Sequence, residues 1–340
     1  MRLSVFFIPL VLLSGCGFVD GLIADKLIAD QEKIRSFEAV YTERGTIPGS
    51  PDAPVKIRVR FEAPSNFTSE VIEPVDYAGD AFAYVGSEMW FYSRFGNYGV
   101  HVKNLLWDPA RWRAAIRASV TLNRAAFDYQ AEDESETVAN RAADVYRLSP
   151  KQEGELLLPG RVWLDRDFTI PLRVELGSLY RSQIEEITFN RPHDAVSFEP
   201  PTNALWFEYD MNAPSLTEEE VDHFADFPIL EPREAQGVTR TKIMRTGNEG
   251  LPVISLVYEK GPFLTSVTET MDRGFVDPGL RGVLVDLGEV KGRLSFAAGS
   301  TVIVFVKKGV AVSILTTLPS YEAVRFARTL ETREEAPRRQ

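Results

Sequence analysis

The stretch VKIRVRF, residues 55–61, decides the fold of this 340-residue chain. Apolar residues alternate strictly with cations along its whole length. Successive side chains of a β-strand point to opposite faces, so this pattern predicts a half-buried strand with one apolar and one cationic face. Antiparallel sheets commonly pack one face on a core and leave the other in water. The stretch therefore predicts a strand of an antiparallel sheet.

Further strand-like stretches follow at short intervals, separated by Gly, Pro, Asp and Asn. They are FTSEVIEP (67–74), AFAYV (81–85), EMWFYSR (88–94), YGVHVKN (98–104), TVANRAADVYRLSP (137–150), ELLLPGRVWLDRD (155–167), IPLRVEL (170–176) and SQIEEITFN (182–190). A run of about ten strands makes a sheet too long to stay flat. We expect it to curl into an unclosed antiparallel half-barrel.

Two helices are predicted to cover the open side of this half-barrel as a lid. Apolar residues at helical spacing predict the first over about 22–36. Asp108 suits the N-cap of the second, and Pro109 suits its first position. The apolar face of the second helix is Trp112, Ala115, Ile116 and Val120.

A second block of strands begins after a polar, acidic stretch. It includes a predicted hairpin that turns at Lys307-Lys308-Gly309 and a closing helix that carries Ala323, Phe326, Ala327 and Leu330 on one face. The predicted fold class is therefore α+β, with a smaller C-terminal α+β domain after the half-barrel. The predicted division is signal peptide 1–15, tether 16–21, half-barrel domain 22–207, linker 208–225, C-terminal domain 226–332 and frayed tail 333–340.

The first residues predict export from the cytoplasm. Arg2 precedes an apolar stretch, residues 5–13, that is too short to cross about 30 Å of hydrocarbon as a helix. Such a stretch is typical of a secretory signal. LSGC, residues 13–16, resembles the bacterial lipobox, which has an aliphatic residue, two small residues and then a cysteine. The alternative is a plain secretory signal with an incidental cysteine.

The lipobox resemblance implies cleavage before Cys16 and acyl chains, such as palmitate, on that residue. Two or more chains make a stable membrane anchor, whereas one chain is marginal. Cys16 is the only cysteine, so the chain has no internal disulfide. Gly17 stands where an Asp would resemble an inner-membrane retention signal. These features predict a bacterial cell-envelope protein, anchored by lipid and facing the periplasm from the outer membrane.

Composition and motifs exclude several classes of function. A net charge of −11 argues against a nucleic-acid partner. His101, His193 and His223 have no second His or Cys at ligand spacing, so no metal site or other cofactor is expected. Catalytic motifs are missing, and acidic runs such as 132–136 and 218–220 are typical of solvated loops. We expect no enzyme, although carboxylates distant in sequence could still converge.

Aromatic residues suggest a binding function. The run 88–92 places three rings on one predicted strand, and further rings lie nearby. Such side chains either fill the core of a curled sheet or leave an apolar groove under the lid helices. On the second reading the groove binds a hydrophobic ligand. Its hypothetical lining residues are Val59, Phe61, Phe67, Trp90, Tyr92, Trp112 and Ile116.

The order of these elements resembles the Lol-type lipoprotein carrier superfamily over residues 22–202. The resemblance rests on FEAVY (37–41), VKIRVRFEAPSNF (55–67), GSEMWFY (86–92), RVWLDRDFTIPLRVEL (161–176) and VSFEPP (196–201). That superfamily includes a soluble periplasmic carrier, its outer-membrane receptor and a two-domain regulator of an envelope-stress anti-sigma factor. The resemblance implies an unclosed barrel, a helical lid and an apolar cavity that binds acyl chains. The anchor and the second domain depart from the simple carrier, so no carrier residue is transferred.

Three functions remain open from the sequence. The first is an anchored envelope protein that binds a lipoprotein acyl chain or a lipid, in lipoprotein sorting or transport. The second is a signalling module that holds another envelope protein, of the anti-sigma type, through its C-terminal domain and releases it when lipid is sensed. The third is a structural lipoprotein that uses the fold only as a scaffold.

Overall fold

The computed structural model describes residues 20–333, except residues 95, 155, 193, 234–236, 249–250, 275, 277–278 and 298–299. The predicted signal peptide, Cys16, most of the tether and the tail after residue 333 lie outside the described residues. The described part is mostly β with four helices. It contains a large unclosed mixed sheet and a separate seven-strand antiparallel sheet.

The large sheet has twelve strands. They are β1 (Ser36–Arg44), β2 (Val55–Glu62), β3 (Asn66–Glu73), β4 (Ala81–Val85), β5 (Glu88–Ser93), β6 (Tyr98–Lys103), β7 (Phe127–Val138), β8 (Arg141–Pro150), β9 (Gly160–Asp165), β10 (Pro171–Leu176), β11 (Tyr180–Phe189) and β12 (Leu205–Asp210). Their order is β12-β6-β5-β4-β3-β2-β1-β11-β10-β9-β8-β7. The predicted strand 55–61 is confirmed, and every second residue of β2 is buried.

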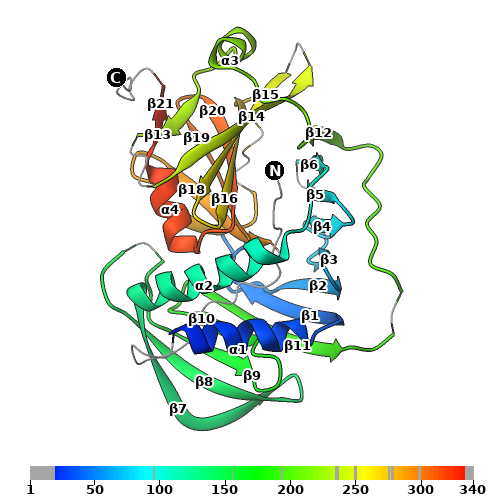
Figure 1. Cartoon of the computed structure of the whole chain (residues 1–340), viewed down its shortest axis with the longest axis vertical. Coiled ribbons are helices and arrows are strands. Elements are labelled where there is room, and N and C mark those ends of the chain that lie inside the picture. Colours follow the sequence, from blue (N-terminus) through cyan, green and yellow to red (C-terminus); the bar gives the residue numbers. More distant parts are fainter. Residues whose placement is uncertain are drawn as a thin grey trace.

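The sheet is mixed, whereas the sequence predicted a purely antiparallel one. β12 pairs in parallel with β6, from Leu205 opposite Tyr98 to Asp210 opposite Lys103. The long segment between β11 and β12 crosses the sheet and makes this parallel arrangement possible (Figure 1). β12 also crosses the predicted boundary between residues 207 and 208, because its six residues continue the first sheet.

Helices α1 (Asp20–Glu32) and α2 (Pro109–Ala126) lie together across the curled sheet (Figure 1). α1 ends four residues earlier than predicted, because β1 begins at Ser36. The start of α2 is confirmed, since the Asp108 carboxylate accepts hydrogen bonds from the backbone N–H groups of Ala110 (3.0 Å) and Arg111 (3.2 Å). The predicted apolar face of α2 is buried.

The C-terminal sheet has the order β14-β15-β16-β20-β19-β18-β17. Its strands are β14 (Thr239–Asn248), β15 (Leu251–Lys260), β16 (Phe263–Met271), β17 (Val283–Asp286), β18 (Lys291–Ala297), β19 (Ser300–Lys307) and β20 (Val310–Thr316). The predicted hairpin joins β19 to β20, and Lys308 and Gly309 both have positive φ, at 51° and 78°, as a two-residue turn requires.

Four short elements complete the C-terminal part. Helix α3 (Glu218–Phe224) lies in the segment that the sequence predicted as a linker, and it begins with a capping box between Thr217 and Glu220. Helix α4 (Ser320–Arg328) ends before Leu330, which was predicted on its face. Leu330 instead starts β21 (Leu330–Thr332), which pairs with β13 (Leu230–Pro232).

The C-terminal sheet packs against the inner face of the large sheet. Ile57 and Phe82 of the large sheet and Val302 and Val304 of β19 line one small cavity between them. Arg111 of α2 also donates a hydrogen bond to the backbone carbonyl of Pro262, at 2.9 Å. The inner wall is therefore covered in two parts, one by α1 and α2 and the other by the C-terminal sheet.

Candidate functional site

The strand register divides the predicted lining residues between two faces of the large sheet. Phe61 lies opposite Phe67, Phe67 lies opposite Tyr84, and Tyr84 lies opposite Met89. Residues directly opposite each other share a face. Met89 therefore belongs to the inner face with Phe61, and the next residue, Trp90, belongs to the outer face.

This register corrects the prediction for Trp90 and Tyr92, which do not face the inner groove. On the outer face the Trp90 ring stacks on His101, with ring centres 4.9 Å apart, and the Tyr92 ring stacks on Trp206 at 5.9 Å. Three consecutive rings on a strand cannot share one face. Of the three rings, only that of Phe91 points inward. The alternation of inner and outer side chains along this strand, starting from Met89, could have predicted this.

An apolar cavity of about 330 Å³ lies where α1 ends, α2 begins and the β2–β3 turn passes. It brings together two predicted residues, Phe61 and Trp112. Val59, Phe67 and Ile116 are buried but do not line it. The full lining is Gln31, Glu32, Ile34, Phe37, Phe61, Ala63, Pro64, Ser65, Trp107, Pro109, Trp112 and Arg113.

One side of the rim of this cavity is apolar, and the Glu32–Arg113 ion pair lies on the rim as well. Ala63, Pro64 and Pro109 line the cavity and are exposed to solvent. Leu106, one residue before the lining residue Trp107, is 50% exposed, which is unusual for a large apolar side chain. Isolated exposed apolar residues are common, but here they gather around one opening. The opening therefore presents an apolar collar to the solvent.

The polar side chains that line the cavity are a minority, namely Gln31, Glu32, Ser65 and Arg113. Arg113 donates from Nε and Nη2 to one carboxylate oxygen of Glu32, at 2.8 and 2.6 Å, and so joins α2 to α1 at the rim. Both side chains are more than 40% exposed, so the pair adds little stability. Trp112 Nε1 is buried and has no hydrogen-bond partner among the described residues. The interior thus offers apolar walls and little polar recognition.

The two described histidines, His101 and His223, do not lie in a cluster of metal-ligating side chains. His101 lies between Glu88 and Glu208, with ring nitrogens 3.2 and 3.1 Å from their carboxylates. Hydrogen bonds from Lys103 and His101 lower the pKa of Glu208. Across the described ranges, no three His, Cys, Asp or Glu residues gather as metal ligands would. His193 lies outside these ranges. Of the helices in the described part, none is long and apolar enough to cross a bilayer.

Comparisons with known proteins find likeness only among solved structures. No protein-family model and no curated protein matches the chain. A crystal structure of MucB is 15% identical, with 94% of this chain and 100% of that chain covered and a TM-score of 0.47. The MucA/MucB complex of Pseudomonas aeruginosa is 14% identical, with 93% of this chain and 99% of that chain covered and a TM-score of 0.45. A LolA-superfamily protein of Nitrosomonas europaea is 9% identical, with 86% of this chain and 90% of that chain covered and a TM-score of 0.20.

Proposed function

We propose that this protein is a lipid-anchored cell-envelope protein that binds an acyl chain or a lipid in the cavity beneath α1 and α2. The observation that carries the proposal is the 330 Å³ apolar cavity between Phe61 and Trp112, with its apolar collar. Cavities of 300 to 1,000 Å³ are usual for small-molecule ligands. Each methylene that enters such a cavity contributes about 0.8 kcal/mol.

The walls favour an apolar ligand over a charged one. A charged molecule would lose its hydration inside and would find few hydrogen-bond partners there. Glu32 and Arg113 at the rim neutralise each other, so they attract no particular charge. An acyl chain can occupy the interior while its polar end stays in water at the rim.

The anchor proposed at Cys16 places this cavity near a bilayer. The cavity lies at the far end of α1, whose 13 residues are about 20 Å long, and the four residues from Cys16 to Asp20 add at most about 14 Å. We place the protein at the outer membrane, facing the periplasm. A ligand delivered from a membrane or from another envelope lipoprotein would then have a short path to the collar.

Filling the opening tests the cavity. In residues 17–340 expressed without an anchor, Ala63→Trp is expected to weaken binding of a fluorescent fatty acid by about tenfold or more, because an indole in the opening displaces at least about two methylenes of the ligand. Displacement fluorescence measures the affinity. Ala142→Trp, at an exposed position on β8, is the matched control and should bind like the wild type. Equal affinity of both variants, or no binding by the wild type, would contradict the proposal.

Metabolic labelling tests the anchor. A palmitate analogue is expected to label the full chain in bacteria and to follow it into the membrane fraction, because Cys16 is the only thiol available. Cys16→Ser should lose both the label and the membrane association. An unlabelled wild-type protein in the soluble fraction would refute the anchor while leaving the cavity to be judged by the first test.

A further inference from the structure

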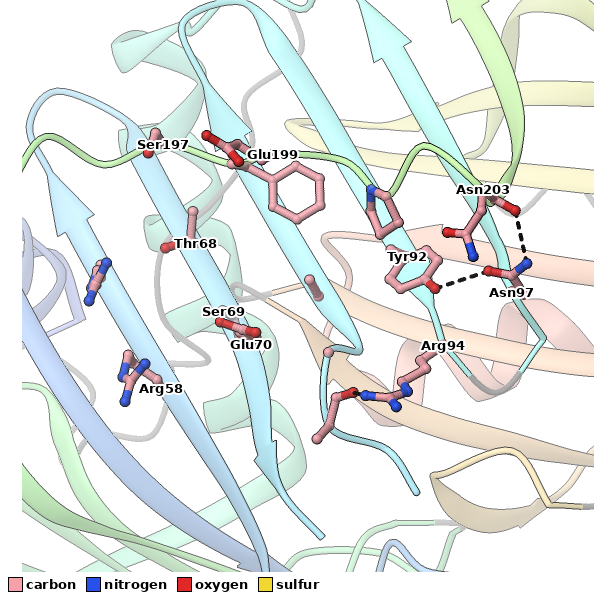
Figure 2. Close-up of a pocket in the computed structure, with 16 residues that line it drawn as sticks. Arg58, Thr68, Ser69, Glu70, Tyr92, Arg94, Asn97, Ser197, Glu199 and Asn203 are labelled. Carbon is pink, nitrogen blue, oxygen red and sulfur yellow. Dashed lines mark hydrogen bonds between the residues drawn. The ribbon is translucent and has the colours of Figure 1, made fainter. Parts of the chain in front are cut away.

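A second, larger cavity lies on the outer face of the large sheet. It has a volume of about 620 Å³ and lies beneath residues 194–204, which we call the strap (Figure 2). The strap lies on the way from β11 to β12 across the outer face of β2–β5. This cavity is separate from the site proposed above, which opens on the inner side of the sheet.

The floor of this cavity follows from the strand register. Arg58 lies opposite Glu70, Glu70 lies opposite Ala81, and Ala81 lies opposite Tyr92. These four side chains form a row across the outer face of β2, β3, β4 and β5. The small side chain of Ala81 leaves a hollow between the Tyr92 ring and the two charged side chains, Arg58 and Glu70.

The roof is held in place by the strap's contacts with the sheet. Trp206 Nε1 donates to the carbonyl of Pro201, and Asn97 Nδ2 donates to the carbonyl of Asn203, both at 3.0 Å. The Phe198 ring packs near Trp90, with centres 5.7 Å apart. Figure 2 shows Asn97 bridging Tyr92 of the floor and Asn203 of the strap. The hollow is therefore formed before any ligand arrives.

Charges of both signs at this cavity have no partner. Arg58, Glu70 and Glu199 make no ion pair or hydrogen bond with any described residue, although all three line the cavity. The cations on either side of Arg58 along β2 are paired: Arg60 with Glu38 at 3.2 Å, and Lys56 with Glu73 at 3.6 Å. Arg58 is thus the one cation of β2 without a carboxylate partner among the described residues.

We propose that this cavity binds a small zwitterion, an α-amino acid or a dipeptide with an aromatic side chain. Arg58 holds the ligand's carboxylate, because a guanidinium matches that group with two parallel hydrogen bonds. Glu70 and Glu199 hold its ammonium. The side chain lies against Tyr92 and Phe198. A ligand with only an anionic group would leave Glu70 and Glu199 without a partner, and one with only a cationic group would leave Arg58 without one.

Four probes test this assignment on residues 17–340 by isothermal titration and by amide NMR shifts. They are L-phenylalanine, glycyl-L-phenylalanine, 3-phenylpropionate and phenethylamine. L-Phenylalanine or its dipeptide is expected to bind and to shift the amides of the floor and the strap. The two singly charged analogues should bind at least about tenfold more weakly. Tighter binding of L-phenylalanine would identify the ligand as an amino acid, and tighter binding of glycyl-L-phenylalanine would identify it as a dipeptide.

Substitutions assign the two charges. Arg58→Gln should lower the affinity for L-phenylalanine about tenfold and should not lower the affinity for phenethylamine. Glu70→Gln should leave the affinity for 3-phenylpropionate unchanged. Arg117→Gln, on the outside of α2, removes the same charge far from the cavity and should leave all affinities unchanged. Thermal melting verifies that each variant is folded.

Three results would overturn the inference. One is the absence of any amide shift at the cavity with all four probes at about 10 mM, a range that detects even weak binding. Another is 3-phenylpropionate binding as tightly as L-phenylalanine, which would make the cavity a simple anion site. The third is equal affinity of folded Arg58→Gln and Arg117→Gln, which would show that Arg58 does not contact the ligand.

Discussion

Replacing Arg281 by alanine is expected to lower the free energy of unfolding by about 3–5 kcal/mol. The Arg281 guanidinium pairs with the Glu43 carboxylate of β1, and the two side chains are only 13% and 2% exposed. Removing the cation leaves the carboxylate buried, with Thr46 Oγ1 at 3.2 Å as a remaining donor. An unpaired buried charge is far more costly than a lost surface pair.

This ion pair joins the C-terminal part of the chain to the large sheet. Beside it, the Gly282 N–H donates to the Thr46 carbonyl at 2.7 Å, and the Tyr77 hydroxyl donates to the Gly279 carbonyl at 2.8 Å. Loss of the pair should therefore weaken the contact between the two sheets as well as the fold. Urea unfolding followed by tryptophan fluorescence measures the effect, with each transition fitted separately if two appear.

Two controls separate the buried pair from charge removal in general. Arg233→Ala breaks an exposed pair with Glu331 and should cost less than about 1 kcal/mol. The double replacement of Glu43 by Leu and Arg281 by Met should recover most of the loss, because apolar groups of similar size remove the unpaired charge. A cost for Arg281→Ala no larger than that for Arg233→Ala would show that the pair does not hold the sheets together.

Local patterns were predictable because short-range physics determines them. The alternation of apolar and charged residues in β2 predicted both that the segment is a strand and which of its faces is buried. Asp108 and Pro109 fixed the start of α2, because a capping carboxylate and a residue without an N–H suit the first turn. The Lys308-Gly309 turn needs only two residues with positive φ. Each of these signals lies within a few residues of the structure that it forms.

Long-range pairing was not predictable in the same way. β12 pairs with β6 across about a hundred residues of sequence, and the sequence of β12 does not indicate which strand it pairs with. The acidic run at 132–136 looked like a solvated loop, but it lies within β7, where Glu132 pairs with Arg147 and Arg161 at 2.9 Å. The arginines that neutralise Glu132 lie on other strands. The acidic run by itself therefore led to the wrong prediction of a loop.

The candidate site was predictable only in part, for the same reason. Phe61 and Trp112 came from two reliable local patterns, a strand and a capped helix, and both line the cavity. Trp107 and Ile34 were missed, because they become wall residues only where the end of α1 meets the start of α2. Trp90 was misplaced because a shift of one residue along a strand moves a side chain to the other face.

Replacing Glu269 by glutamine is expected to stabilise the protein at neutral and alkaline pH. Glu269 of β16 is fully buried, and its Oε2 accepts a hydrogen bond from the Leu230 N–H at 3.0 Å. Oε1 has no partner in the described part of the chain. Burial raises the pKa of this carboxyl well above its ordinary value of 4.5; the nearby Glu231 raises it further, and Arg333 lowers it. The folded protein therefore keeps the proton on Glu269 to a higher pH than the unfolded chain does.

The direction of the pH dependence follows from this raised pKa. Above pH 4.5 the unfolded chain releases the proton of Glu269, whereas the folded chain keeps it until its own higher pKa is reached. The protonated group's contribution is thus fully present below the unfolded pKa, and it is lost at about 1.4 kcal/mol per pH unit above it. An amide has no proton to release and still accepts from Leu230, so Glu269→Gln should lack this loss. The stability of Glu269→Gln should equal that of the wild type near pH 4.

Urea unfolding of both proteins at a series of pH values from about 4 to about 8 measures the difference between the two slopes. Glu153→Gln is the matched control, because Glu153 is exposed and pairs with no described residue, so this variant should follow the wild type at every pH. Tyr258 and Arg240 also lie near this group and are present in all three proteins, so their effects cancel in the comparison. Parallel slopes for Glu269→Gln and the wild type would mean that Glu269 is ionised in the folded protein. Arg333 would then have to compensate a buried carboxylate, and the amide variant would be the less stable protein at neutral pH.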